Sequence, residues 1–195
     1  MDEDGDLLQR LRVGDEAAFG ELVDRYHPAM LRLARSMLPS AAVAEEAVQD
    51  TWMAVVRGIE RFEGRSSLKT WLFRILANRA RSTGAKEQRD SSNPLGPAVD
   101  AACFDVDGAW LHPVAPWQEQ SEDRLDAARF APLVRSALDQ LPARQRAVVV
   151  LRDVDGLSSD EVCTVLALTP GNQRLLLHRG RSRLREMLET AMRRD

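Results

Sequence analysis

The sequence predicts an all-α protein made of two small helical domains that are joined by a long irregular linker. The chain of 195 residues has one tyrosine and five phenylalanines, and it is rich in Ala, Leu, Arg and Val, a composition that favours helices. Apolar residues recur at helical spacing before residue 85 and after residue 118, but not between them. We therefore expect a first domain at residues 1–84, a linker at 85–118 and a second domain at 119–195.

The first domain is expected to begin with two helices. Asp15 can cap a helix that runs to about Met37, and Pro39 separates it from a second helix over about 42–60. The spacing of the second helix gives it an apolar side, which we expect to be buried, and a polar side. The apolar side consists of Val48, Trp52, Val55 and Ile59. The polar side consists of Glu45, Glu46, Gln49 and Asp50, with Met53 at its end.

A third helix is expected to follow the loop RFEGRSS at residues 61–67. It opens at Ser67, runs to about Ser82 and has its own apolar face. That face consists of Leu68, Leu72, Ile75 and Leu76. The side chains that remain for solvent or a ligand are Lys69, Arg74, Asn78 and Arg81.

The linker is dominated by Gly, Pro, Ser and Asp, which do not sustain a helical period. Trp110 and Trp117 within it are unusual, and they are candidates for docking onto one of the domains or onto a partner.

Charge is segregated along the chain, although the net charge is only −3. Residues 1–56 and 90–140 each carry a net charge of −6, whereas residues 57–89 carry +6 and residues 141–195 carry +3. Two positive blocks between acidic ones suggest two anion-binding surfaces, although ordinary solvated helix faces would give the same pattern.

The second domain is expected to begin with two helices over about 121–140, with a break near Pro132. A third helix over 142–153 is expected after the Leu141-Pro142 boundary.

A helix-turn-helix pattern ends the chain. Ser158 and Glu161 have the spacing of a capping box for a short helix over 159–166. Thr169 as N-cap and Pro170 at the first helical position then open a long basic helix. Two helices joined by a tight turn, with the second one basic, are typical of DNA-binding domains.

The last helix has an apolar edge and an arginine-rich flank. At about 100° per residue, the edge consists of Leu177, Leu184 and Leu188, with Gly180 beside them. The flank consists of Arg174, His178, Arg181 and Arg185, and Arg179 lies nearly opposite the edge. Such a helix is suited to phosphates and base edges, and a surface helix that merely lacks acids is the alternative.

Several function classes are not expected. No apolar run approaches the roughly 20 residues that cross a bilayer, and the acidic N-terminus MDEDGD is unlike a signal peptide. We therefore expect a cytoplasmic protein. Cys103, Cys163 and His112 do not have the spacing of a metal site. No catalytic constellation surrounds the histidines, so we expect no metal, no cofactor and no enzymatic activity.

Three segments resemble conserved regions of bacterial RNA polymerase sigma factors. The segments AEEAVQDTWMAVV and RFEGRSSLKTWLFRILANRAR resemble the second conserved region. The segment LPARQRAVVVLRDVDGLSSDEVCTVLALTPGNQRLLLHRGRSRLREML resembles the fourth region. The segments occur in the family's order, and the linker separates the second from the third. They leave no room for the first-region extension or the third-region domain, and this architecture resembles the extracytoplasmic-function (group IV) class.

The resemblance implies three binding surfaces. The residues implied to bind the β′ clamp helices of core RNA polymerase are Glu45, Glu46, Gln49, Asp50 and Met53. The residues implied to hold the −10 DNA are Arg61, Phe62, Arg65, Ser66, Ser67, Lys69, Arg74, Asn78 and Arg81. The residues implied to read the −35 DNA are Thr169, Asn172, Arg174, His178, Arg179, Arg181 and Arg185. The resemblance also implies the polymerase β flap and an anti-sigma factor as partners, but neither membrane insertion nor a small-molecule substrate.

The sequence departs from the family pattern in the last two helices. Ala167 stands where a turn glycine is usual, and Leu175 and Leu176 stand where a serine and an arginine are common. These two leucines are interpreted either as contacts to thymine methyl groups or as a docking patch for a protein partner, and we favour the partner.

We therefore expect a sigma factor of the alternative type, which directs promoter recognition, −10 melting and transcription initiation. The alternative is a helix-turn-helix repressor or activator with a helical sensor domain. Such a protein needs neither the acidic stripe at 45–50 nor the basic third helix.

Overall fold

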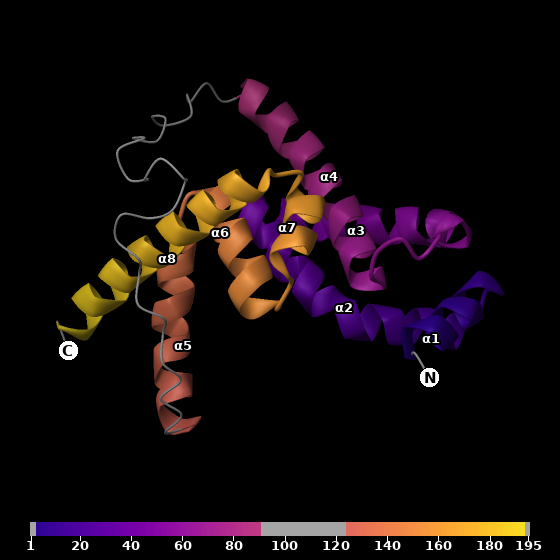
Figure 1. Cartoon of the computed structure of the whole chain (residues 1–195), viewed down its shortest axis with the longest axis horizontal. Coiled ribbons are helices and arrows are strands. Elements are labelled where there is room, and N and C mark those ends of the chain that lie inside the picture. The colour runs from indigo at the N-terminus through magenta and orange to yellow at the C-terminus, as the bar shows by residue number, and fades with distance from the viewer. Residues whose placement is uncertain (1–2, 91–123, 194–195) are drawn as a thin grey trace.

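The computed structural model describes residues 3–90 and 124–193, and every regular element within these ranges is helical. The elements of the N-terminal half are α1 (Glu3–Arg12), α2 (Glu16–Met37), α3 (Ala41–Gly58), the 3-10 turn η1 (Ile59–Arg61) and α4 (Leu68–Asp90). The elements of the C-terminal half are α5 (Arg124–Asp139), α6 (Ala143–Val149), the π-helical turn η3 (Val150–Val154), α7 (Ser159–Leu166) and α8 (Pro170–Met192). The predicted all-α fold is therefore confirmed (Figure 1).

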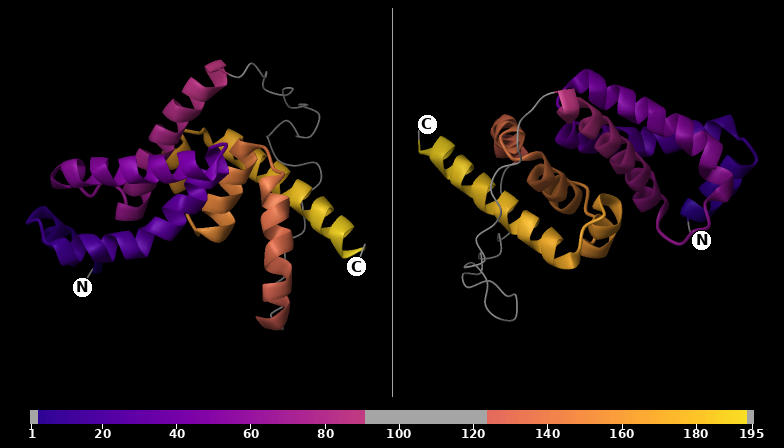
Figure 2. Two further views of the ribbon diagram at one scale, coloured as in Figure 1. Left: turned by 180° about the vertical axis from the view of Figure 1, so that it is seen from behind. Right: turned by 90° about the horizontal axis from the view of Figure 1, so that it is seen from above.

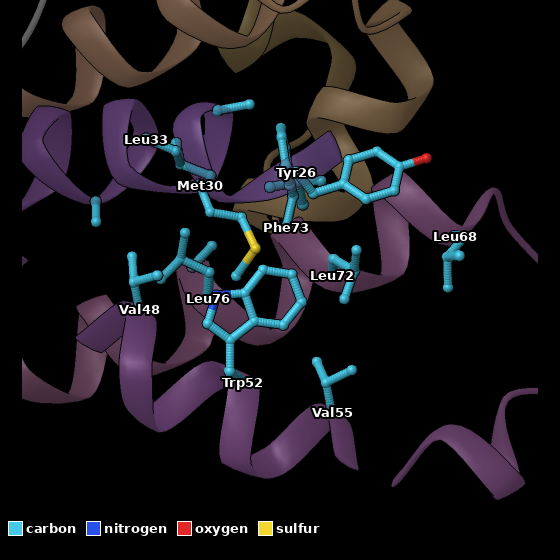
Figure 3. Packing of buried hydrophobic residues seen from close by; sticks show 14 of the residues in the cluster. Tyr26, Met30, Leu33, Val48, Trp52, Val55, Leu68, Leu72, Phe73 and Leu76 are labelled. Atoms are coloured by element: carbon cyan, nitrogen blue, oxygen red, sulfur yellow. The ribbon is translucent and has the colours of Figure 1, made fainter. Parts of the chain in front are cut away.

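Helices α2, α3 and α4 pack against one another around the N-terminal core. The apolar positions that recur at helical spacing are the ones that become buried, including Met30, Trp52 and Leu72. Figure 3 shows these three side chains, one from each helix, turned toward the same interior. The indole N–H of Trp52 donates a hydrogen bond to Nδ1 of His27 at 3.2 Å. The only polar atom of this buried ring is thereby satisfied.

Short polar side chains begin the helices of this half. The Asp15 carboxylate accepts hydrogen bonds from the amides of Ala17 and Ala18, at 2.9 and 3.2 Å. The hydrogen bond from Arg10, and then these amides, hold the pKa of Asp15 below its ordinary value. Ser40 caps α3 by accepting from the Val43 amide at 3.3 Å. The helix starts expected near residues 15 and 42 are thus explained by N-caps.

Helix α1 was not expected from the sequence. It packs against α2 and buries Leu7 and Leu11, which are 1% and 8% exposed. Its ten residues contain few apolar positions, so the sequence alone gives only a weak helical period. The core of the N-terminal half is therefore larger than the three-helix prediction.

In the C-terminal half, α6 crosses α8 and α5 also packs against α8. The capping box of α7 is present, because the Glu161 amide donates to the Ser158 hydroxyl at 3.2 Å and the Ser158 amide donates to Glu161 Oε2 at 2.9 Å. The Thr169 hydroxyl accepts from the Asn172 amide at 3.3 Å and caps α8. The two helices of the predicted helix-turn-helix are therefore confirmed.

Three boundaries differ from the sequence prediction. Helix α4 continues to Asp90 rather than ending near Ser82, so the irregular segment expected from residue 85 does not begin there. Helix α5 runs through Pro132 without a break, because one missing amide donor does not end a helix whose other hydrogen bonds persist. The helix expected over 142–153 changes to π geometry at Val150. The linker tryptophans Trp110 and Trp117 lie outside the described residues.

The two halves are packed against each other. Helix α7 lies against α4, and α6 lies against α2, an arrangement that can be followed from two further directions in Figure 2. One cluster of buried apolar residues runs through both halves, and it includes Leu33 and Leu72 from the first and Leu151 and Val162 from the second. The candidate binding surfaces therefore belong to one closely packed body.

Candidate nucleic-acid interface

The start of α8 presents its polar residues to solvent. Thr169, Asn172 and Arg174 are all exposed, and the Thr169 cap fixes the direction in which the helix begins. The turn before it contains Ala167, whose φ of 51° lies in the left-handed region where glycine is usual. The first turn of α8 thus offers amide, hydroxyl and guanidinium donors suited to DNA.

Further along α8, the predicted arginine flank is divided between solvent and the protein. Arg181 pairs with Asp153 of η3, with Nε and Nη2 at 3.0 and 2.6 Å from its carboxylate oxygens. This hydrogen bond raises the pKa of Arg181. Arg183 donates to Oε1 of Gln145 at 3.2 Å. Arg174 and Arg185 are exposed, and Arg181 also remains exposed beside its partner, so the flank presents positive charge along its length.

His178 and Arg179 are half-buried in the middle of α8. Burial lowers the pKa of His178, and the nearby charge of Arg179 lowers it further. His178 is therefore neutral near pH 7 and adds no charge to the flank, although an imidazole can still form hydrogen bonds.

The three consecutive leucines of α8 are half-buried rather than exposed. Leu176 and Leu177 pack against the apolar core cluster. Part of the Leu176 side chain is therefore used in packing within the fold, and its role in a docking patch stays a prediction. Leu175 is not part of that cluster. Both interpretations of it, a contact to thymine methyl groups and a docking patch for a protein partner, therefore stay predictions.

The loop between η1 and α4 carries the first part of the predicted −10 site. Arg61 and Arg65 are exposed, and Arg65 pairs with Glu63. Phe62 is only 7% exposed, and its ring meets that of Trp71 with centroids 5.1 Å apart. The Phe62 side chain therefore supports the loop from inside and does not face a DNA strand, in contrast to the prediction.

Arg12 at the end of α1 holds the beginning of this loop. Its Nη2 donates a hydrogen bond of 2.6 Å to the main-chain oxygen of Phe62. The other end of the loop is fixed by Ser67, whose Oγ accepts from the Thr70 amide at 3.1 Å. Gly64 lies between these anchors at a φ of 70°, a conformation that favours glycine. The role of Arg12 was not predictable from the sequence, because a contact across 50 residues has no local signal.

The exposed side of α4 carries the second part of the predicted −10 site. Arg74 and Asn78 are exposed, and the Arg81 guanidinium donates to the side-chain oxygen of Asn78. Lys69 differs from the expectation, because it is half-buried and its ammonium group already has a partner within the chain. It sits 5.8 Å from the centre of the Phe73 ring and donates to the main-chain oxygen of Asp155 at 2.5 Å.

The predicted polar stripe of α3 is exposed along its whole length. Glu45 pairs with Arg35 at 3.2 Å, and Asp50 pairs with Arg79 of α4 at 3.0 Å. Met53 is 55% exposed, so the stripe ends in an apolar contact point. Glu46 and Gln49 are exposed between these residues. An acidic stripe with one exposed methionine suits a basic helical partner.

A groove of about 680 Å³ joins the α3 stripe to α4. Glu46 and Asp50 line one side of it, and Asn78 and Arg79 line the other. The residues predicted for polymerase binding and those predicted for DNA binding are therefore continuous across this groove.

The described residues contain no group of three or more side chains suited to a metal ion. Burial raises the pKa of the Cys163 thiol, and the charge of Asp160 raises it further, which makes this thiol a poor nucleophile. Cys103 and His112 lie outside the described residues. None of the helices in the described ranges combines the length and apolarity that crossing a bilayer requires.

Comparisons with known proteins assign both halves. Residues 22–90 match the family model of Sigma-70 region 2, and residues 132–184 match that of Sigma-70, region 4. The chain is 28% identical over 193 residues to the RNA polymerase sigma-H factor of Pseudomonas aeruginosa, covering 99% of this chain and 97% of that protein. It is also 28% identical over 188 residues to the ECF RNA polymerase sigma-E factor of Escherichia coli, covering 96% and 95%.

Two solved structures are similar over most of the chain. The sigma factor RpoE in complex with the anti-sigma factor NepR from Bartonella quintana is 30% identical with a TM-score of 0.60, and 88% of this chain and 96% of that chain are covered. CnrH in complex with the cytosolic domain of CnrY is 27% identical with a TM-score of 0.61, and 97% and 99% are covered.

Proposed function

The chain belongs to the extracytoplasmic-function class of the sigma-70 family, and we propose that its three exposed surfaces divide the work of transcription initiation. Sigma factors are not enzymes; they give core RNA polymerase its promoter specificity. In this proposal α3 binds the polymerase, the loop before α4 together with α4 holds the opened −10 DNA, and α8 reads the −35 DNA. The protein would act in the cytoplasm, where the polymerase is.

The α3 stripe is proposed to dock on the β′ clamp helices. Its acidic residues are exposed, and Met53 adds a small apolar contact at the end of the stripe. Charge complementarity of this kind steers association and fixes the register of a partner helix. The C-terminal half is proposed to contact the β flap, as the resemblance of this half to region 4 implies.

The −10 surface is proposed to hold the single strand after melting. A melted strand needs donors along its backbone and a pocket that offsets the cost of unstacking a base. Arg61, Arg65 and Arg74 are exposed cations on this surface. The loop between them is anchored at both of its ends, and fixed ends reduce the entropy lost when the strand binds.

The −35 surface is proposed to consist of the first turns of α8, with Asn172 and Arg174 nearest the base edges and Arg185 near the backbone. Arg181, which pairs with Asp153, orders the middle of the flank. The observation that carries the whole proposal is that two different helices expose surfaces of opposite character, an acidic stripe on α3 and a basic helix start on α8.

An anti-sigma factor is proposed as a regulatory partner. The similar RpoE structure contains the anti-sigma factor NepR, and the similar CnrH structure contains the cytosolic domain of CnrY. The alternative function, a repressor with a helical sensor domain, has no comparable support, because the region corresponding to the sensor matches Sigma-70 region 2.

Two pairs of substitutions test this division. Glu46→Arg with Asp50→Arg should weaken binding to core polymerase and leave the affinity of the free chain for −35 duplex DNA unchanged. Arg174→Ala with Arg185→Ala should do the reverse, and each lost phosphate contact should reduce the slope of log affinity against log salt by about 0.9. Arg135→Ala with Arg144→Ala is the matched control, because both arginines are exposed but lie on α5 and α6. If both test pairs weakened polymerase binding and −35 DNA binding to the same extent, the assignment of these two functions to α3 and α8 would be contradicted.

Runoff transcription with core polymerase on promoter DNA tests the function as a whole. The wild-type chain should produce transcripts from a defined start site, and core polymerase alone should not.

A further inference from the structure

Arg79 of α4 lies between two surfaces to which the proposed function gives different partners, and it was not predicted to belong to either of them. Its Nη1 donates a hydrogen bond of 3.0 Å to Oδ2 of Asp50 on α3. Asp50 belongs to the stripe proposed to bind polymerase. Asn78, the residue before Arg79, belongs to the surface proposed to hold the −10 strand. One arginine therefore joins the polymerase-binding helix to the DNA-binding helix.

The groove between α3 and α4 gives the Arg79 side chain room to move. It has a volume of about 680 Å³, and Asp50, Asn78 and Arg79 all line it. The Arg79 side chain is 37% exposed, so it borders water. Because Arg79 and Asn78 are neighbours on α4, a change of rotamer is sufficient to bring the guanidinium from Asp50 to the side of Asn78. The backbone of α4 does not have to move.

The ion pair between Arg79 and Asp50 is of a kind that a partner protein can replace. The Asp50 side chain is 61% exposed. Exposed pairs shift an equilibrium by no more than about fivefold, because water screens them and long side chains lose rotamer freedom in forming them. A basic side chain of the polymerase that contacts Asp50 forms the same kind of bond in a drier interface, where the attraction is stronger. The polymerase therefore competes with Arg79 for this carboxylate.

The other acidic residues of the stripe do not have this relation to α4. Glu45 pairs with Arg35 of α2 at 3.2 Å, on a helix that has no proposed contact with the −10 strand. Glu46 lines the same groove as Asp50, but it forms no ion pair with any residue that the structure describes. Of these three acidic residues, Asp50 is the one that holds a cation of the DNA-binding helix.

We propose that Arg79 is a further −10 DNA-binding residue, which Asp50 holds in the free chain and which core polymerase releases by taking its place on Asp50. The released guanidinium then binds a phosphate of the opened strand beside Asn78, since guanidinium groups bind carboxylate and phosphate oxygens in the same way. The proposal rests on the proposed function, because it needs the polymerase contact of Asp50 and the −10 contact of Asn78. Since coupling between two sites is reciprocal, the bound strand also strengthens the contact of Asp50 with polymerase.

The affinity of the free full-length chain for a single-stranded oligonucleotide gives the first test. The oligonucleotide carries the non-template −10 sequence of a promoter that the chain transcribes. Asp50→Asn releases Arg79, so the affinity should rise, by up to about fivefold. Glu45→Gln and Glu46→Gln are matched controls that should stay near the wild-type value, because each removes one negative charge from the same stripe and neither releases a cation of α4. An equal gain in all three variants would overturn the proposal, since it would reflect net charge alone.

Arg79→Gln shows whether the gain in Asp50→Asn comes from this arginine. Alone, it should change the affinity of the free chain little, because Asp50 already holds the guanidinium. Combined with Asp50→Asn, it should remove the gain. Arg79→Lys combined with Asp50→Asn keeps a cation and should preserve most of the gain. If the variant with both Asp50→Asn and Arg79→Gln kept the full gain, the proposal would be overturned, because the gain would have another source.

The chain bound to core polymerase should depend on Arg79 more strongly than the free chain does. In this holoenzyme, Arg79→Gln should weaken oligonucleotide binding about tenfold, the usual effect of losing a charge-assisted hydrogen bond. The slope of log affinity against log salt should fall by about 0.7, the contribution of one phosphate of a single strand. Arg135→Gln, which removes the same charge from an exposed position on α5, is the control and should change neither quantity.

Two results with the holoenzyme would overturn the proposal. The first is an equal affinity and an equal salt slope of the wild-type and Arg79→Gln holoenzymes. The second is an equal loss of affinity in the free chain and in the holoenzyme, because it would mean that Arg79 only fastens α4 to α3.

Runoff transcription separates this proposal from the proposed function. Failure of the wild-type chain to transcribe with core polymerase would contradict the proposed function. If the wild type transcribes and the Arg79→Gln holoenzyme binds the strand as tightly as the wild type does, only the role of Arg79 is contradicted.

Discussion

Gly180 of α8 lies directly against Val149 of α6, so closely that a Cβ atom built on residue 180 would be 2.6 Å from Val149 Cγ2. The same Cβ atom on residue 180 would lie 3.4 Å from the main-chain oxygen of Gln145. Val149 is buried and β-branched, and its side chain has little freedom to move away. The absence of a side chain at residue 180 therefore sets how closely α6 and α8 cross.

Gly180→Ala should lower the free energy of unfolding by about 1–3 kcal/mol, the usual cost of overpacking. This loss should outweigh the helix propensity that alanine adds, which is about 1 kcal/mol. Urea denaturation measures the change, and adding Val149→Ala should recover part of it. Gly20→Ala in α2 is the control, because a Cβ there has no neighbour within 4 Å and the variant should gain stability. Equal stability of the two alanine variants would contradict the tight crossing.

Gln173→Met should raise the free energy of unfolding by about 1–3 kcal/mol, because an unpaired buried amide carries a desolvation penalty of that size. Gln173 is 1% exposed, and neither of its amide atoms has a hydrogen-bond partner among the described residues. Methionine fills a similar volume without polar hydrogens. Thermal unfolding measures the gain, and a lower melting temperature would show that the amide is satisfied in solution.

Arg12→Ala should reduce the formation of open promoter complexes about fivefold, corresponding to roughly 1 kcal/mol for the lost hydrogen bond. The reason is that the main-chain oxygen of Phe62 loses its anchor, and the loop after it becomes less ordered. Permanganate footprinting of the −10 region measures opening. Arg12→Lys, which keeps a donor, should restore part of it. Affinity for core polymerase should not change, and a parallel loss there would point to general misfolding.

Acid should weaken the start of α7. The Ser158 amide, and then contacts from α4, lower the pKa of Glu161 in the folded chain. A lowered folded-state pKa means that the stabilisation is present above the unfolded value, about 4.3, and is lost as the pH falls through the folded value. Glu161→Gln keeps the capping geometry but does not titrate. The melting temperature of this variant should fall less steeply below about pH 4.5 than that of the wild type.

A residual acid dependence should remain in Glu161→Gln, because Asp15 also has a lowered pKa. Asp15→Asn should remove the part of the acid dependence of the melting temperature that is due to the Asp15 carboxylate. Identical acid profiles of Glu161→Gln and the wild type would contradict the role of the Glu161 carboxylate.

The parts of the fold with local signals were predictable from the sequence. The Ser158 capping box, the Thr169-Pro170 helix start and the exposed stripe on α3 depend on residues within a turn or two of one another, and such short-range rules can be read directly. The apolar periods of α2, α3 and α4 predicted their buried faces for the same reason.

The parts that escaped prediction depend on residues far apart in the chain. Arg32 and Asp155 are separated by 123 positions, and Lys69 and Asp155 by 86, so no local pattern connects them. The inward position of Phe62 and the packing of Leu176 likewise follow from what the neighbouring helices bring against them. Sequence spacing identified the candidate surfaces, but it did not show that one of them is partly covered.

Asp155 joins two helices in two different ways, since its side chain serves α2 and its main chain serves α4. A substitution at this position can abolish the first link, whereas the carbonyl group of any amino acid can preserve the second. The link between this turn and α2 can consequently be weakened by substitution while the link to α4 stays in place, so the two contacts are separable by mutation.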